Sequence, residues 1–130
     1  MATLQSDDAL EIGKGFIRAL EHQAWEELAT FFDSAAQFRA LTPNGLRVAD
    51  DGDTAAKYLR KWFGDADQLI LLSSEVKRMH DRLHISYLIR EHEDQWYIVE
   101  QQAYCTIRDG QIKEMDLLCS GFRPEVLPEP

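Results

Sequence analysis

The chain has 130 residues, of which 45% are hydrophobic and 28% are charged, which is the composition of one globular domain and excludes a disordered or fibrous protein. Its 14 Lys and Arg residues against 23 Asp and Glu residues give a net charge of −9, which repels nucleic acid phosphates and anionic membranes. No apolar run approaches the roughly 18 residues of a membrane span, and the N-terminus is not signal-like. We therefore expect a cytoplasmic protein without nucleic-acid or membrane partners.

Helical periodicity predicts three helices in the first half of the chain. The first covers residues 7–21, with Ser6 as its N-cap. A short second helix carries the apolar stripe of residues 25–32. The third helix, about 54–64, is expected to begin after a cap at Asp53.

Strand periodicity dominates the second half of the chain. After a short strand at 35–41, an antiparallel meander is predicted, with strands at 68–78, 82–92, 95–108 and 111–120. This order gives an α+β fold in which the helices cover one face of a bent sheet. The expected organisation is an N-terminal tail (1–6), one domain (7–122) and a disordered, proline-rich tail (123–130).

Three segments carry a resemblance to a known family: Trp25–Ala40, the aromatic helix end Tyr58–Phe63 and the closing hairpin Ile107–Met115. Together they resemble the nuclear transport factor 2-like superfamily, with its SnoaL-like polyketide cyclase and ketosteroid isomerase branch nearest. The resemblance covers residues 7–122. It implies a cone-shaped α+β barrel with one apolar pocket between the helices and the concave sheet, and a homodimer formed through the convex face.

The resemblance does not extend to the catalytic groups of steroid isomerases. Those relatives use a tyrosine in the first helix, a base aspartate after the second helix and an acidic group on the next-to-last strand. The corresponding positions here hold Phe16, Arg39 (or the adjacent Ala40) and Ala103, none of which performs these roles. Steroid-type isomerisation is therefore not predicted, and no cofactor or metal is expected.

The inner face of the last two strands has two alternatives. A regular Asp109-Gly110 turn pairs Ile107 with Ile112 and directs Asp116 inward. A bulge near the hairpin instead turns Met115 inward, which the resemblance favours. If Asp116 is inward, it is a buried carboxylate and a general-base candidate; if outward, it is an ordinary solvated residue.

With the methionine face inward, the expected pocket has apolar walls and one amide. Trp62 and Tyr87 are expected as walls and Gln101 as the main polar contact. The two cysteines are expected to be reduced and to pack as small apolar groups. The predicted ligand-binding residues are Phe16, Phe38, Trp62, Tyr87, Gln101, Cys105, Met115 and Cys119.

Two functions are consistent with this sequence. In the first, the cone binds a small apolar or aromatic metabolite, with cofactor-independent isomerisation, cyclisation or hydration as the accompanying chemistry. In the second, the domain is a non-catalytic, dimerising interaction module whose pocket is filled by its own side chains. An open cavity of roughly 300 Å³ or more favours the first, and a filled cone favours the second.

Overall fold

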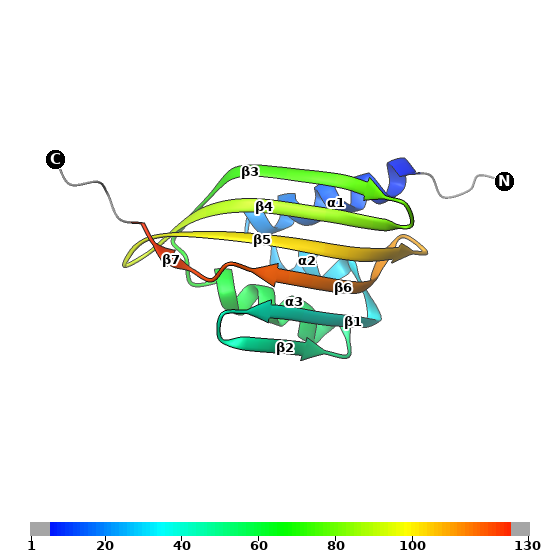
Figure 1. Cartoon of the computed structure of the whole chain (residues 1–130), viewed down its shortest axis with the longest axis horizontal. Helices are drawn as coiled ribbons and strands as arrows, with labels where there is room; N and C mark the ends of the chain where they lie inside the picture. The colour runs from blue at the N-terminus through cyan, green and yellow to red at the C-terminus, as the bar shows by residue number, and fades with distance from the viewer. Residues whose placement is uncertain (1–5, 126–130) are drawn as a thin grey trace.

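The computed structural model describes residues 6–125 and shows three helices against one face of a single curved sheet (Figure 1). The elements are α1 (Ser6–Glu21), α2 (Trp25–Thr30), β1 (Phe32–Thr42), β2 (Gly45–Ala49), α3 (Gly52–Phe63), β3 (Gln68–Met79), β4 (Arg82–Glu93), β5 (Gln95–Arg108), β6 (Gln111–Cys119) and β7 (Arg123–Pro124). The expected α+β cone is confirmed. Within the described range, no helix has the length and apolar character needed to cross a membrane.

The third helix starts earlier than predicted. Asp51, and not Asp53, is the N-cap, because its carboxylate accepts a hydrogen bond from the Thr54 amide at 2.7 Å. Gly52 then brings the helix against β1. A Cβ at this position would lie 2.4 Å from the carbonyl oxygen of Asp33, so this close approach requires glycine.

The sheet has the strand order β2-β1-β6-β5-β4-β3, and β7 pairs with β5. The predicted meander of β3, β4, β5 and β6 is confirmed. Two features were missed. β1 begins at Phe32 and runs parallel to β6, and β2 forms an antiparallel hairpin with β1. The sheet is therefore mixed, and the second helix is shorter than its apolar stripe suggests because Phe32 already belongs to the strand.

Alternation along the strands separates an inner face, covered by the helices, from an outer face. On β5, Val99, Gln101, Ala103 and Cys105 are buried. The register between β5 and β6 shifts between Thr106 and Ile107, so that Cys105 pairs with Met115. This is the bulge that an inward methionine face requires.

The end of the described chain is tied to the sheet. Arg123–Pro124 form β7 against β5, and the Glu125 carboxylate accepts hydrogen bonds from Arg90 Nε and Nη2 at 3.0 and 2.8 Å. The expected disordered tail therefore does not include Arg123–Glu125. Residues 1–5 and 126–130 lie outside the described residues.

Candidate functional site

The predicted pocket residues come from all layers of the cone. Seven of the eight lie on the inner face or on α1, and all of these except Cys119 are buried. Trp62 on α3 is half-buried; its ring centroid lies 5.8 Å from that of Tyr58 and 6.4 Å from that of Phe38. These eight residues are Phe16, Phe38, Trp62, Tyr87, Gln101, Cys105, Met115 and Cys119.

A row of three polar side chains crosses the apolar interior from β4 to β6. The Tyr87 hydroxyl donates to Gln101 Oε1 at 2.6 Å, and Gln101 Nε2 donates to Cys119 Sγ at 3.2 Å. The backbone amide of Gly121 approaches the same sulfur at 3.4 Å. The row places hydrogen-bonding groups where the surrounding side chains offer none.

Burial keeps this interior uncharged. Desolvation raises the pKa of the Tyr87 phenol well above its ordinary value, so the hydroxyl remains a donor. Desolvation also raises the pKa of the Cys105 thiol from 9.0 to about 12. Cys105 is therefore a protonated, packed side chain and not a thiolate nucleophile.

The interior is filled in this conformation. Phe16, Gln101 and Cys105 each have an exposed fraction of 0%, so these three side chains border no void that admits water. Hollows do occur at the surface, such as one of about 620 Å³ over Phe32 and the start of α3 and one of about 90 Å³ beside the start of α1. Neither is lined by the polar row.

The general-base candidate Asp116 lies on the outer face. Its carboxylate accepts a hydrogen bond from Arg39 Nε at 2.9 Å and lies 3.9 Å from Arg82 Nη1, with 38% of the side chain exposed. Asp116 is thus an ion-paired strand residue, because the bulge turns Met115 inward instead. Of the three positions that correspond to the steroid isomerase groups, Arg39 forms this ion pair on the outer face, and Phe16 and Ala103 are buried and apolar.

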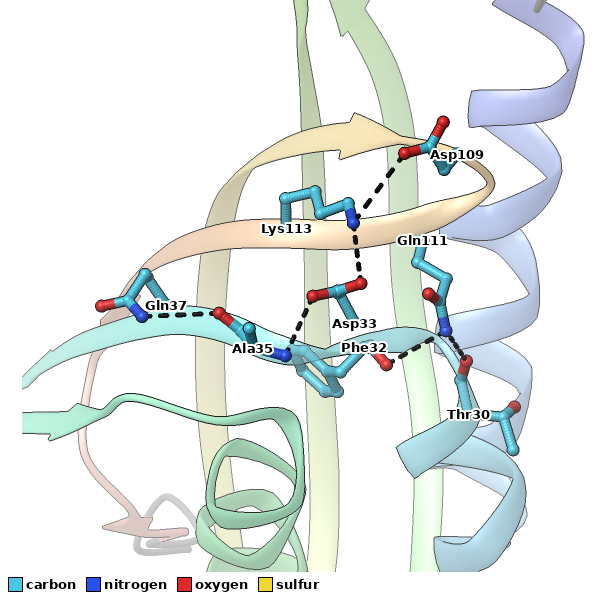
Figure 2. A network of polar contacts seen from close by, with 8 residues as sticks. All are labelled: Thr30, Phe32, Asp33, Ala35, Gln37, Asp109, Gln111 and Lys113. Carbon is cyan, nitrogen blue, oxygen red and sulfur yellow. Dashed lines mark hydrogen bonds and ion pairs between the residues drawn. The ribbon is translucent and has the colours of Figure 1, made fainter.

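A polar network fixes the start of β1 against β6 (Figure 2). The Lys113 ammonium lies 2.7 Å from the Asp33 carboxylate and 3.9 Å from that of Asp109. The Gln111 amide donates to the carbonyl oxygens of Thr30 and Phe32 at 3.3 Å each. The Gln111 contacts satisfy backbone carbonyl groups, and the Lys113 contacts pair charges, where the register between β1 and β6 is irregular, so we assign them a structural role.

Glu91 was not among the predicted site residues, although it is 1% exposed and faces inward near the end of β4. Its Oε2 has no hydrogen-bond partner among the described residues. Desolvation, with contributions from the charges of Glu93 and Asp65, raises its pKa from 4.5 to about 7. The sequence pattern could have identified it, because the alternation that places Tyr87 and Ile89 on the inner face of β4 also places Glu91 there.

No family model and no curated protein matches the sequence. Solved structures match with high coverage. One, named as an isomerase, from Bacillus subtilis, has a TM-score of 0.75 at 13% identity over 91% of this chain and 90% of that chain. A protein named as a polyketide cyclase, from Xanthomonas campestris pv. campestris, has a TM-score of 0.69 at 16% identity over 86% and 90%.

An LEH-like epoxide hydrolase from M. tuberculosis also matches, with a TM-score of 0.69 at 11% identity over 88% of this chain and 84% of that chain. The TM-scores show that these three structures share the overall fold described above. The protein has the nuclear transport factor 2-like fold. At these identities the likeness establishes the fold alone, so function must be argued from the residues of this chain.

Proposed function

We propose that this nuclear transport factor 2-like protein binds a small, largely apolar molecule inside the cone, with a carbonyl oxygen of the ligand at Gln101. The observation that carries the proposal is the partner of the Gln101 amide. Its Nε2 donates to the sulfur of Cys119, and a thiol is a weak acceptor. A carbonyl oxygen is a stronger acceptor, so a ligand carrying one can replace the sulfur with a gain in hydrogen bonding.

The surroundings of Gln101 define the rest of the ligand. Val99, Ala103 and Cys105 flank it on its own strand, and Phe16 packs near Tyr87 with ring centroids 6.5 Å apart. An apolar or aromatic body is therefore the complementary shape and chemistry. The isomerase-type groups are absent, so the proposal is one of binding without that proton-transfer chemistry.

Binding requires a local opening, because the interior side chains leave no free space. The segment that follows Cys119 forms the nearby wall, and its Phe122 ring, which is only partly buried, packs against Phe63 with centroids 5.3 Å apart. The segment is held to β5 on both sides of Phe122, through Ser120 and through Arg123–Pro124, so the opening is a movement of the Phe122 side chain and not of the whole segment. Displacement of Phe122 gives a ligand access to Gln101.

The proposal is tested with acetophenone and ethylbenzene, which differ by the carbonyl oxygen. In NMR titrations of the ¹⁵N-labelled protein, acetophenone is expected to shift the Gln101 side-chain amide signal and ethylbenzene to bind more weakly. Gln101→Leu is expected to remove this difference. Gln102→Leu is the matched control, because Gln102 faces outward and contacts His84 at 3.1 Å. Equal responses of both variants, or no interior shifts with a series of aromatic ketones, would contradict the proposal.

A second candidate function, a self-associating interaction module, is favoured by the filled interior of the cone and by the outer face. Four large apolar side chains, each 49–57% exposed, gather over β2, β1 and β6; we call them the outer apolar patch: Leu41, Leu46, Val48 and Leu118. A hollow of about 200 Å³ is lined by three of them, Leu41, Leu46 and Leu118, and is bordered by Arg39 and Asp116. Opposite charges beside one apolar patch are self-complementary under two-fold symmetry, so a second copy of this chain is the fitting partner.

A further inference from the structure

Glu91 is a buried carboxyl group that the fold leaves without a partner. Among the buried residues of the described chain, the Tyr87 hydroxyl and the Gln101 amide are hydrogen-bonded to one another, whereas Glu91 Oε2 has no partner. A buried acceptor without a donor destabilises a fold, and such groups in native proteins call for an explanation. The missing partner of Glu91 Oε2 is therefore evidence for a ligand group.

The neighbours of Glu91 define which partner fits. Its cross-strand neighbours are Leu69 on β3 and Tyr97 on β5, which offer an apolar side chain and an aromatic ring. The charged groups that bear on it are Glu93 on its own strand and Asp65 on the loop after α3, and both are acidic. The electrostatic environment therefore disfavours an anion and favours a cation that donates hydrogen bonds.

A short loop borders this carboxyl and offers a route to it. The loop covers residues 64–67 and is held by the side chain of Gln23, whose Nε2 donates to the carbonyl oxygens of Phe63 and Ala66 at 3.1 Å each. Gln23 has a φ of 53°, a left-handed conformation that is uncommon for residues other than glycine. The loop is also attached to β4, because the Asp67 amide donates to the His92 carbonyl oxygen at 3.0 Å and the Asp67 carboxylate lies 2.8 Å from His92 Nδ1. Movement of the loop therefore requires release of the Gln23 contacts and of the contacts between Asp67 and His92.

We propose that the Glu91 carboxylate is the binding group for an organic ammonium ion with an apolar body, reached when the loop 64–67 moves aside. The ammonium donates to Oε2 and places a positive charge beside a carboxyl group on which the acidic Glu93 and Asp65 act. The apolar body lies between Leu69 and Tyr97, whose ring also attracts cations. In residues 6–125 no three His, Cys, Asp or Glu side chains converge on a possible metal position, so an organic cation fits better than a metal ion.

This site goes beyond the proposed function and shares only the cone with it. Glu91 lies four residues along β4 from Tyr87, about 13 Å at 3.3 Å per residue, so it is distinct from the Gln101 amide. Each site therefore has its own test. Acetophenone binding at Gln101 can fail while ammonium binding at Glu91 holds, and the reverse.

The experiment follows the Glu91 carboxyl carbon by ¹³C NMR while pH is varied, with benzylamine as the probe. Benzylamine is expected to lower the midpoint of the Glu91 titration by about one pH unit or more, because it binds the carboxylate form. By the same linkage, its affinity is expected to rise about tenfold between roughly pH 6 and pH 8. Glu91→Gln is expected to abolish the effect, whereas Glu93→Gln, which removes a nearby charge and keeps the buried carboxyl, retains it.

Three results would overturn the proposal. The first is a Glu91 midpoint that does not move in the presence of excess benzylamine. The second is equal benzylamine affinity in the wild type and the Glu91→Gln variant, which is nonspecific binding. The third is equal binding of benzyl alcohol, which would assign the site to a neutral donor and not to a cation.

Discussion

At the scale of single residues, two buried polar side chains of the inner face, Gln101 and Glu91, differ in whether their hydrogen-bonding groups have partners. The Gln101 amide has partners on both sides, so it is stable within the apolar interior. The Glu91 carboxyl has an orphaned oxygen, and its pKa of about 7 means that it remains protonated until neutral pH. The two groups therefore affect the stability of the fold in different ways, and substitution of each residue alone measures its own effect.

Glu91 makes the folded state sensitive to pH. Its pKa is raised from 4.5 to about 7 on folding, so stability falls as pH rises from about 4.5 through about 7, and the loss is complete above that. This rise in the pKa of Glu91 corresponds to a loss of about 3 kcal/mol in the free energy of unfolding. In urea unfolding experiments, Glu91→Gln is expected to be more stable than the wild type near pH 9 by an amount approaching this figure.

The matched control for this prediction is Glu93→Gln, which removes an acidic charge from the same strand. It is expected to change the pH dependence only slightly, because the buried carboxyl is still present. If the wild type and Glu91→Gln show the same stability profile from about pH 4 to pH 9, the carboxyl is not desolvated as described.

Gln101→Leu tests the polar row. The substitution leaves the Tyr87 hydroxyl buried without its acceptor, so the free energy of unfolding is expected to fall by about 1–3 kcal/mol while the protein still folds. Adding Tyr87→Phe removes the orphaned hydroxyl and is expected to recover part of this loss. Urea unfolding of both single variants and the double variant measures the coupling. Simple additivity would show that the 2.6 Å contact contributes nothing.

At the scale of elements, the junction of β1 with β6 depends on side chains as much as on backbone. The two strands run parallel, and their register shifts between Phe32 and Gln37. Lys113 on β6 reaches Asp33 in this irregular stretch, where both side chains are largely covered. The hydrogen bond from Lys113 holds the pKa of Asp33 below its ordinary value.

Lys113→Met is expected to destabilise the protein at neutral pH. A carboxyl whose pKa is lowered by folding contributes stability above its unfolded pKa, and this contribution is lost as pH falls through the folded value. The difference between Lys113→Met and the wild type is therefore expected to shrink below about pH 4, as measured by urea unfolding. Lys14→Met is the control, because its partner Glu11 is 69% exposed and the pair is on the surface. An equal effect of both substitutions would contradict the structural role of Lys113.

At the scale of the whole molecule, the strands of the meander could be predicted because their alternation is strong. Leu83, Ile85, Tyr87 and Ile89 follow a period of two, and the Asp109-Gly110 turn has positive φ at both residues, as a type I′ hairpin requires. The inward direction of Met115 was not decided by alternation alone. It depends on a one-residue bulge, which leaves no signal in residue types.

Other features could not be read from the chain because they arise from contacts between distant segments. The parallel pairing of β1 with β6 joins residues about 80 positions apart, such as Phe38 and Met115. β2 was missed because it has only five residues, Gly45–Ala49, and follows directly on the Pro43-Asn44-Gly45 turn, so its alternation of Leu46 and Val48 with Arg47 is too short to predict a strand. Asp53 was predicted as the N-cap of α3 instead of Asp51, because both residues precede the same apolar stripe. Only the hydrogen bond from the Thr54 amide to Asp51 distinguishes them.

The outer apolar patch predicts self-association of the whole molecule. Leu118→Lys places a charge in the patch and is expected to shift the protein toward the monomer in sedimentation experiments at micromolar concentration. Glu75→Lys, an exposed change of charge on β3, is the control and is expected to leave the assembly unchanged. A wild-type protein that sediments as a monomer at this concentration would remove the module hypothesis.

The most direct measurement of the central claim is a crystal structure grown with acetophenone. The account predicts the ketone inside the cone, its oxygen within hydrogen-bond distance of Gln101 Nε2, with Cys119 Sγ displaced from that nitrogen and Phe122 moved away from Phe63. An interior that keeps the 3.2 Å contact between Gln101 and Cys119, with the ketone absent or bound only at the outer face, would contradict it.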